Sequence, residues 1–220
     1  PHPARYTPSL LPLVARHLEA GWRVLDPFAG TGGVHQLRAL AAVDTVGVEI
    51  QPKWAAWHPD TICADLFDVD FPTRSFDAVV TSPTYGNRMA DNFTPTDPTG
   101  RRSYRITHGE PLHPNNSGLL AWGPTYRNFH TRAWARVVPW TGRRLILNVK
   151  DHQRDGQRAP VVAWHRATLE ALGLVLVADI PVAAPGYRRG ANRDARLDER
   201  VLVFDVTDDE GPSDGLRLVG

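Results

Sequence analysis

The residues 26–33 (DPFAGTGG) combine one acidic side chain with three glycines. Glycine lets the backbone approach a ligand closely and adopt dihedral angles that other residues avoid. The G-x-G-x-x-G fingerprint of a dinucleotide site would need a third glycine at the position of His35. The carboxylate of Asp26 is also badly placed for a pyrophosphate, but it would attract cationic groups. The segment therefore predicts a site for a ligand that carries positive charge.

Two further acids follow at intervals that suit the same ligand. Glu49 lies at the end of TVGVEI (45–50), and Asp65 lies in CADLF (63–67). We expect Glu49 at a solvent-lined strand end, where its carboxylate would accept hydrogen bonds from two ribose hydroxyls. Asp65 could accept one from an adenine amino group, with Ile50 and Phe67 packing on the faces of the ring. Asp65 alone is equally typical of a solvated strand end, but the two acids together favour an adenosine-containing ligand.

This half of the chain resembles the S-adenosylmethionine (SAM) binding half of class I methyltransferases. The segment 81–87 (TSPTYGN) narrows the resemblance to the amino-methyltransferases of nucleic-acid bases, whose motif is (Asp/Asn/Ser)-Pro-Pro-(Tyr/Phe/Trp). Ser82, Pro83 and Tyr85 match this motif, and Thr84 stands where a second proline is usual. The resemblance implies SAM as the cofactor, bound by Tyr6, Thr7, Asp26, Phe28, Gly30, Gly32, Glu49, Ile50, Asp65 and Leu66.

The catalytic residues implied by the resemblance are Ser82, Pro83 and Tyr85. The exocyclic nitrogen of a base is a poor nucleophile because its lone pair is delocalised into the ring. The Ser82 hydroxyl and the Pro83 carbonyl could accept both amino hydrogens and turn the lone pair toward the methyl group. The ring face of Tyr85, and not its hydroxyl, would stack on the base. Serine at the first position is commoner in cytosine-N4 enzymes, so we favour N4 of cytosine over N6 of adenine.

A polar segment, 86–124, follows this motif without a sustained apolar period, and long segments of this kind are often functional. Arginine and asparagine side chains bind phosphates and base edges. We expect a target-recognition insertion here, with a solvated loop as the alternative. A second basic loop, 186–193, could hold the same nucleic acid. The residues expected to bind nucleic acid are Asn87, Arg88, Arg101, Arg102, Arg105, Arg188 and Arg189.

Alternating strand and helix patterns must position these residues. They predict an α/β fold, the Rossmann-like class I methyltransferase fold, with a mostly parallel sheet, helices on both faces and a polar insertion after the fourth strand. The expected strands are 22–25, 45–50, a weak one near 62, 76–81, 144–149, 174–182 and 200–206. The expected helices are 10–20, 33–42, 53–57, 125–138 and 160–172.

The length of 220 residues suits one SAM-dependent methyltransferase domain, 1–220, with 86–124 as its insertion. No apolar run approaches the roughly 18 residues of a membrane helix. The single cysteine, Cys63, excludes an internal disulfide. The net charge is +1, and Lys53 and Lys150 are the only lysines among 25 basic residues. We expect a cytoplasmic, nucleoid-associated protein of prokaryotic or phage origin, with DNA as its partner.

Several features leave alternatives open. His108, His113 and His130 lack the ligand spacing of a metal site, so no metal is expected. The segment 150–152 (KDH) lies either at the rim of the active site or in a structural turn. An RNA base methyltransferase is the second hypothesis for the function. A catalytically inactive SAM-binding subunit is the third, and Thr84 is the only feature that favours it.

Overall fold

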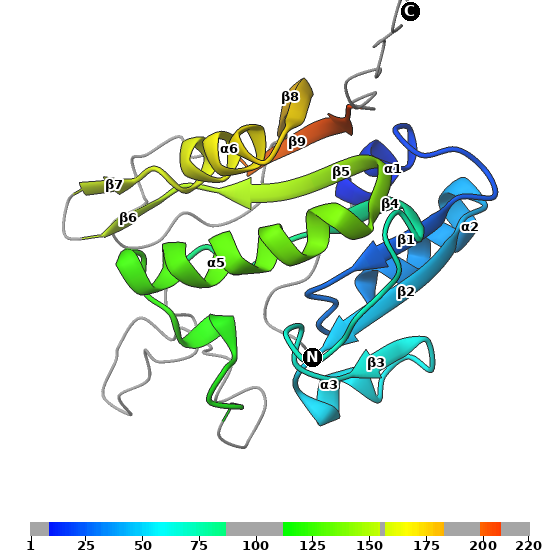
Figure 1. Ribbon diagram of the computed structural model, residues 1–220, viewed down its shortest axis with the longest axis horizontal. Coiled ribbons are helices and arrows are strands. Elements are labelled where there is room, and N and C mark those ends of the chain that lie inside the picture. The colour runs from blue at the N-terminus through cyan, green and yellow to red at the C-terminus, as the bar shows by residue number, and fades with distance from the viewer. Residues whose placement is uncertain (1–8, 87–111, 155–156, 183–198, 208–220) are drawn as a thin grey trace, which may run out of the picture.

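The computed structural model describes residues 9–86, 112–154, 157–182 and 199–207. Its centre is a seven-stranded sheet in the order β3-β2-β1-β4-β5-β9-β8 (Figure 1). The strands are β1 (Arg23–Asp26), β2 (Asp44–Glu49), β3 (Thr61–Cys63), β4 (Phe76–Thr81), β5 (Thr141–Lys150), β8 (Leu174–Val182) and β9 (Glu199–Val206). All neighbours are parallel except β9, which runs antiparallel to both β5 and β8. The mostly parallel sheet predicted from the sequence is therefore confirmed.

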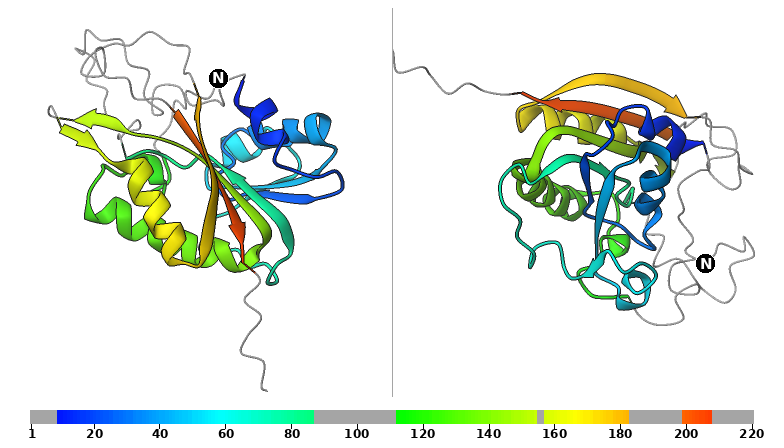
Figure 2. Two further views of the ribbon diagram at one scale, coloured as in Figure 1. Left: turned by 90° about the horizontal axis from the view of Figure 1, so that it is seen from above. Right: turned by 90° about the vertical axis from the view of Figure 1, so that its right-hand side faces the viewer.

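Helices cover both faces of this sheet, as predicted (Figure 2). One face carries α1 and α2, and the other carries α5 and α6. The α-helices are α1 (Leu10–Ala15), α2 (Leu37–Ala41), α3 (Pro52–Ala55), α5 (Pro124–Val137) and α6 (Val161–Ala171). The 3-10 helices are η1 (Gly33–Gln36), η2 (Ser117–Leu119) and η3 (Val138–Trp140).

The core is divided by the sheet into two layers because successive strand residues point to opposite faces. In β1, Val24 packs against the α1 and α2 layer, whereas Leu25 packs against the α5 layer. The same alternation separates Val79 from Val80 in β4. The fully buried Trp134 of α5 is among the largest side chains of the second layer. Burial on both faces explains why these strands read as nearly continuous apolar runs.

Several boundaries differ from the prediction. The helix expected over 10–20 ends at Ala15, after which the chain continues in i→i+3 turns, including His17 N–H to the Val14 carbonyl at 2.9 Å. The helix expected over 33–42 is split into η1 and α2. β5 starts three residues earlier than expected, at Thr141. A small separate hairpin of β6 (His152–Arg154) and β7 (Gln157–Ala159) was not predicted, because three-residue strands leave no periodic pattern.

Candidate active site

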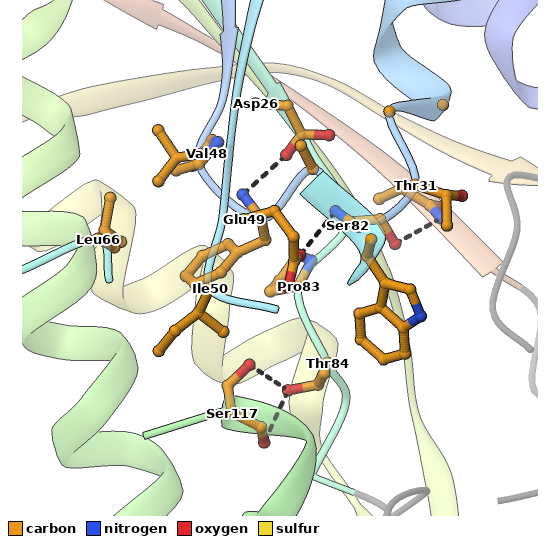
Figure 3. A pocket seen from close by; sticks show the side chains of 18 of the residues that line it. Asp26, Thr31, Val48, Glu49, Ile50, Leu66, Ser82, Pro83, Thr84 and Ser117 are labelled. Atoms are coloured by element: carbon orange, nitrogen blue, oxygen red, sulfur yellow. Dashed lines mark hydrogen bonds between the residues drawn. The ribbon is translucent and has the colours of Figure 1, made fainter. Parts of the chain in front are cut away.

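A cavity of about 890 Å³ lies where the carboxyl ends of the parallel strands meet (Figure 3). Its walls include segments 26–33, 49–50, 64–66, 82–85 and 115–117. This edge is the usual binding place in open α/β sheets. The cavity brings together most of the predicted cofactor and catalytic residues, namely Asp26, Phe28, Gly30, Gly32, Glu49, Ile50, Asp65, Leu66, Ser82, Pro83 and Tyr85.

Asp26 ends β1 with its side chain at the wall of this cavity. It is 1% exposed, and its Oδ1 accepts hydrogen bonds from the Phe28 N–H (3.0 Å) and the Thr81 hydroxyl (2.7 Å). The second bond joins the ends of β1 and β4. Sequence reasoning missed Thr81, because a threonine at the end of a strand is an ordinary β-former.

The glycine turn after β1 rests on the imidazole of His35. Gly32 has φ +76°, and a Cβ at this residue would lie 2.8 Å from His35 Cδ2. The two ring nitrogens of His35 hydrogen-bond to the hydroxyls of Thr45 (2.7 Å) and Thr61 (2.9 Å), and the ring stacks on His58. Burial, helped by the neighbouring His58, lowers the pKa of His35 to about 4. Where a dinucleotide fingerprint would have its third glycine, this chain has a neutral side chain that packs under the turn.

Glu49 ends β2 and is tied to the glycine turn. Its Oε2 accepts a hydrogen bond from the Gly30 N–H (2.9 Å), and its Oε1 accepts one from the Gln51 N–H (2.8 Å). The residue is 8% exposed, so the expectation of a solvent-lined strand end was wrong. Burial raises the pKa of Glu49 to about 7, against the opposing effect of these two donors. Each carboxylate oxygen retains a further lone pair for the hydroxyls of a ligand.

Asp65 lies after β3 and uses both of its oxygens within the protein. Oδ1 accepts a hydrogen bond from the Phe67 N–H (3.0 Å), and Oδ2 accepts one from the Asn115 side-chain amide (2.9 Å). Asn115 belongs to the segment that we assigned to target recognition, and it lines the cavity. Part of that segment therefore contributes to the wall of the predicted cofactor site.

The apolar wall of the cavity differs in one respect from the prediction. Ile50 and Leu66 line it (Figure 3), but Phe67 does not. The ring of Phe67 instead packs edge-on against Phe129, with the ring centroids 5.4 Å apart. The expectation that Phe67 lies against the ring of a ligand is therefore not supported, and Leu66 stands on the cavity side.

The loop after β4 holds a compact polar group. Ser82 Oγ lies 3.1 Å from Tyr85 Oη, and the side-chain amide of Asn148 donates to both oxygens, at 3.3 and 3.2 Å. Asn148 is on β5, the neighbour of β4, and is 5% exposed. Sequence reasoning missed it, because a single asparagine in a strand carries no motif. The Tyr85 hydroxyl, to which we gave no function, is thus part of the group around Ser82.

Thr84, the departure from the family motif, has its own hydrogen bonds. Its hydroxyl lies 3.1 Å from both the carbonyl and the hydroxyl oxygen of Ser117 (Figure 3). Its carbonyl oxygen accepts a hydrogen bond from the hydroxyl of Tyr126 at 2.7 Å. A proline at this position has no hydroxyl for Ser117. The loop is therefore anchored by side chains where the family motif has a second proline.

Behind this loop lies a buried polar chain on α5 and α6. Tyr126 Oη lies 2.8 Å from His165 Nε2, and the Trp134 indole N–H donates to His165 Nδ1 at 3.0 Å. All three residues are 0% exposed. Burial lowers the pKa of His165 and raises that of Tyr126, so both side chains are neutral at neutral pH.

In the segment 150–152, Asp151 has a structural role. Its Oδ1 accepts a hydrogen bond from the Val162 N–H in the first turn of α6 (2.8 Å). Its Oδ2 accepts one from Arg158 (2.7 Å). A carboxylate at this place satisfies a free N–H and interacts favourably with the helix dipole. For Asp151, the structural-turn interpretation is supported.

Other predicted residues lie outside the part of the chain that the structure describes. They are Tyr6 and Thr7 of the cofactor set, and Asn87, Arg88, Arg101, Arg102, Arg105, Arg188 and Arg189 of the nucleic-acid set. Within the described ranges, no group of three or more His, Cys, Asp or Glu side chains could hold a metal ion. None of the helices described here is both long and apolar enough to cross a bilayer.

No family model and no curated protein sequence matches this chain. Solved structures match it over most of its length. The magnesium protoporphyrin IX methyltransferase of Synechocystis PCC 6803, solved with SAH, has a TM-score of 0.56 and 15% identity, over 90% of this chain and 80% of that one. The 1,6-didemethyltoxoflavin-N1-methyltransferase of Burkholderia thailandensis has a TM-score of 0.51 and 15% identity, over 90% and 77%.

A third structure has the same fold and a different reaction in its name. The cyclase SpnF has a TM-score of 0.56 and 14% identity, over 90% of this chain and 80% of its own. The chain has the Rossmann-like fold of class I methyltransferases, as predicted. The side chains of the site, and not the fold alone, decide the reaction, because one fold supports several chemistries.

Proposed function

We propose that this protein uses SAM to methylate an exocyclic amino group of a DNA base, with N4 of cytosine favoured over N6 of adenine. The observation that carries the proposal is the shared cavity. Ser82, Pro83 and Tyr85 line the same space as Asp26 and Glu49. A methyl donor and its acceptor must approach to roughly 3–3.5 Å. A cavity lined by both sets of residues supplies a place where they could meet.

The residues of the cavity fit SAM better than a dinucleotide. The buried carboxylate of Asp26 suits the cationic end of SAM and would repel a pyrophosphate. The carboxylate of Glu49 would accept hydrogen bonds from the ribose hydroxyls, and that of Asp65 would accept one from the adenine amino group. When bound, SAM would supply the methyl group: the carbon–nitrogen bond would form as the carbon–sulfur bond breaks, sulfur would keep the electron pair, and the proton lost from nitrogen would pass to solvent.

The loop after β4 would prepare the acceptor for this transfer. Ser82 Oγ and the Pro83 carbonyl would accept amino hydrogens and direct the nitrogen lone pair at the methyl carbon. The ring of Tyr85 would stack on the base, an interaction worth roughly 1–3 kcal/mol. A base in a duplex must leave its stack to reach such a site, at a cost of a few kcal/mol.

The arginines of the polar segment 86–124 and of the second basic loop, 186–193, are proposed to recognise DNA, because arginine side chains bind phosphates and base edges. The same proposal makes DNA the partner and the nucleoid of a prokaryotic or phage-infected cell the place of action. Tyr6 and Thr7 are proposed to complete the cofactor site. These proposals rest on the sequence alone.

The test is methyl transfer from labelled SAM to matched DNA and RNA, followed by digestion and mass spectrometry. N4-methylcytosine in DNA is the expected product. N6-methyladenine would keep the enzyme class and change the base. Transfer to RNA alone would favour the RNA hypothesis, and SAM binding without any transfer would favour the inactive subunit.

A further inference from the structure

The side-chain oxygen of Asn148 is buried without a hydrogen-bond partner in the described part of the protein. The residue is 5% exposed and lines the cavity of the candidate active site. An unpaired buried acceptor costs about 1–3 kcal/mol. Buried polar groups are nearly always paired in folded proteins, and the exceptions need an explanation. A donor that arrives with a ligand would provide one.

The orientation of the Asn148 amide is set by its two hydroxyl neighbours. Its nitrogen lies 3.3 Å from Ser82 Oγ and 3.2 Å from Tyr85 Oη, so both amide hydrogens have acceptors. Turning the amide over would let its oxygen accept from these hydroxyls and would leave the nitrogen unpaired instead. In either orientation, one polar atom of the Asn148 side chain has no hydrogen-bond partner among the described residues and is available to a ligand. The first orientation suits a ligand donor, and the second suits a ligand acceptor.

We propose that Asn148 Oδ1 accepts a hydrogen bond from the amino group that is methylated, sharing one amino hydrogen with Ser82 Oγ while the Pro83 carbonyl accepts the other, and that Asn148 and Ser82 together select a methyl acceptor that carries N–H. The inference rests on the proposed function and narrows it. An amino group beside Ser82 would be held between the β4 loop and β5. A carboxylate or phenolate in this place would face the lone pairs of Oδ1. As the nitrogen gains positive charge, its N–H groups become better donors, so the bond to Oδ1 would be strongest in the transition state.

Two substitutions separate this function from a purely structural one. Asn148→Leu keeps a similar volume and removes both polar atoms. Asn148→Asp keeps the acceptor oxygen, and the hydroxyls of Ser82 and Tyr85 can donate to its carboxylate. With unmethylated genomic DNA and labelled SAM, we expect single-turnover rates to fall at least about hundredfold in Asn148→Leu and by no more than about tenfold in Asn148→Asp. Calorimetric SAM affinity should stay within about threefold in both variants.

The contrary results are equally definite. If Asn148→Leu retains the wild-type rate, or if both variants lose rate only in proportion to their loss of thermal stability, the inference is wrong. Rescue by aspartate is the result that a packing role would not give.

The atom that receives the methyl group, and the molecule that carries this atom, distinguish a failure of the inference from a failure of the proposed function. Cell extract is incubated with the wild-type protein and labelled SAM, and the products are identified by mass spectrometry. An N-methylated DNA base supports both. An N-methylated product of another kind overturns the DNA proposal and supports the inference. An O- or C-methylated product overturns the inference, and the absence of any transfer overturns both.

Discussion

The hydroxyl group of Tyr126 on α5 donates a hydrogen bond to the carbonyl oxygen of Thr84, in the loop after β4, over 2.7 Å. The indole N–H of Trp134 can only donate, so Nδ1 of the neutral His165 accepts and its proton lies on Nε2. That Nε2–H then donates to Tyr126, whose own proton is left for Thr84. This series of hydrogen bonds, from Trp134 through His165 and Tyr126, therefore has one consistent set of proton positions. It ends on the backbone of the proposed catalytic loop.

We therefore expect Tyr126→Phe to lower turnover while SAM affinity changes by less than about threefold. The substitution leaves the Thr84 carbonyl and the His165 N–H unpaired, at about 1–3 kcal/mol each, and Tyr126 does not line the cavity. Single-turnover rates and calorimetry with SAM test this. Thr168→Val is the control. It also removes a hydroxyl that donates to a backbone carbonyl, but this carbonyl belongs to Trp164 within α6. Loss of thermal stability with unchanged turnover would show that this series of hydrogen bonds only stabilises the fold.

A second prediction concerns the hydroxyl of Thr84. Thr84→Val removes its hydrogen bonds to Ser117 at nearly constant volume, whereas Thr84→Ser keeps a hydroxyl there. We expect faster amide hydrogen exchange over residues 112–123 in the valine variant, because local opening follows the loss of such anchors. The serine variant should exchange nearly as the wild type does. Equal exchange in all three proteins would show that Thr84 does not anchor the segment.

A third prediction concerns the contribution of Glu49 to cofactor binding and stability. Glu49→Ala should weaken SAM binding at least tenfold, which corresponds to about 1.4 kcal/mol. It should also lower the free energy of unfolding by about 1–3 kcal/mol, because the N–H groups of Gly30 and Gln51 lose their acceptor. Calorimetry and denaturant unfolding measure the two effects. Unchanged SAM affinity in a folded variant would remove Glu49 from the ribose site.

The raised pKa of Glu49 gives a fourth prediction. Below its pKa of about 7, the carboxyl binds a proton and loses acceptor capacity. If SAM requires the ionised form, its affinity should fall roughly tenfold for each pH unit below 7. Glu49→Gln should bind more weakly at pH 8 and show a flatter profile. Without ligand, the contribution of Glu49 to the free energy of unfolding changes with pH in the opposite direction to its contribution to SAM binding. The folded protein binds more protons than the unfolded chain between pH 4.5 and about 7, so this group's contribution to stability falls as pH rises through that window.

Sequence patterns predicted the elements and motifs that depend on local order. The apolar run of β4, the glycine turn and the acids that end strands all depend on neighbouring residues. Asn148, Thr81 and the pair of Tyr126 and His165 do not. Each of them acts through a partner 39 to 66 residues away, so only the register of the strands and the packing of α5 on α6 bring the atoms together. The burial of Glu49 was not predicted for the same reason, because its carboxylate accepts a hydrogen bond from the backbone N–H of Gly30, 19 residues earlier.

The last prediction separates catalysis from binding at the loop after β4. Ser82 is proposed to hold an amino hydrogen productively only as the nitrogen becomes tetrahedral, so its effect should lie mainly in the transition state. Ser82→Ala should reduce turnover strongly and leave SAM and DNA affinities within a few-fold of the wild-type values. Tyr85→Ala should lower both turnover and specific DNA binding, because stacking also stabilises the extruded base before reaction.

The contacts of the Tyr85 hydroxyl with Ser82 and Asn148 change one expectation. From the ring face alone, Tyr85→Phe should be mild. With its hydroxyl in the polar group, we expect a partial loss of turnover, smaller than that of Ser82→Ala, and unchanged DNA binding. Single-turnover kinetics and DNA titrations on the three variants provide the comparison. If Ser82→Ala keeps full turnover while Tyr85→Phe is inactive, the chemistry depends on the Tyr85 hydroxyl and the role given to Ser82 is wrong.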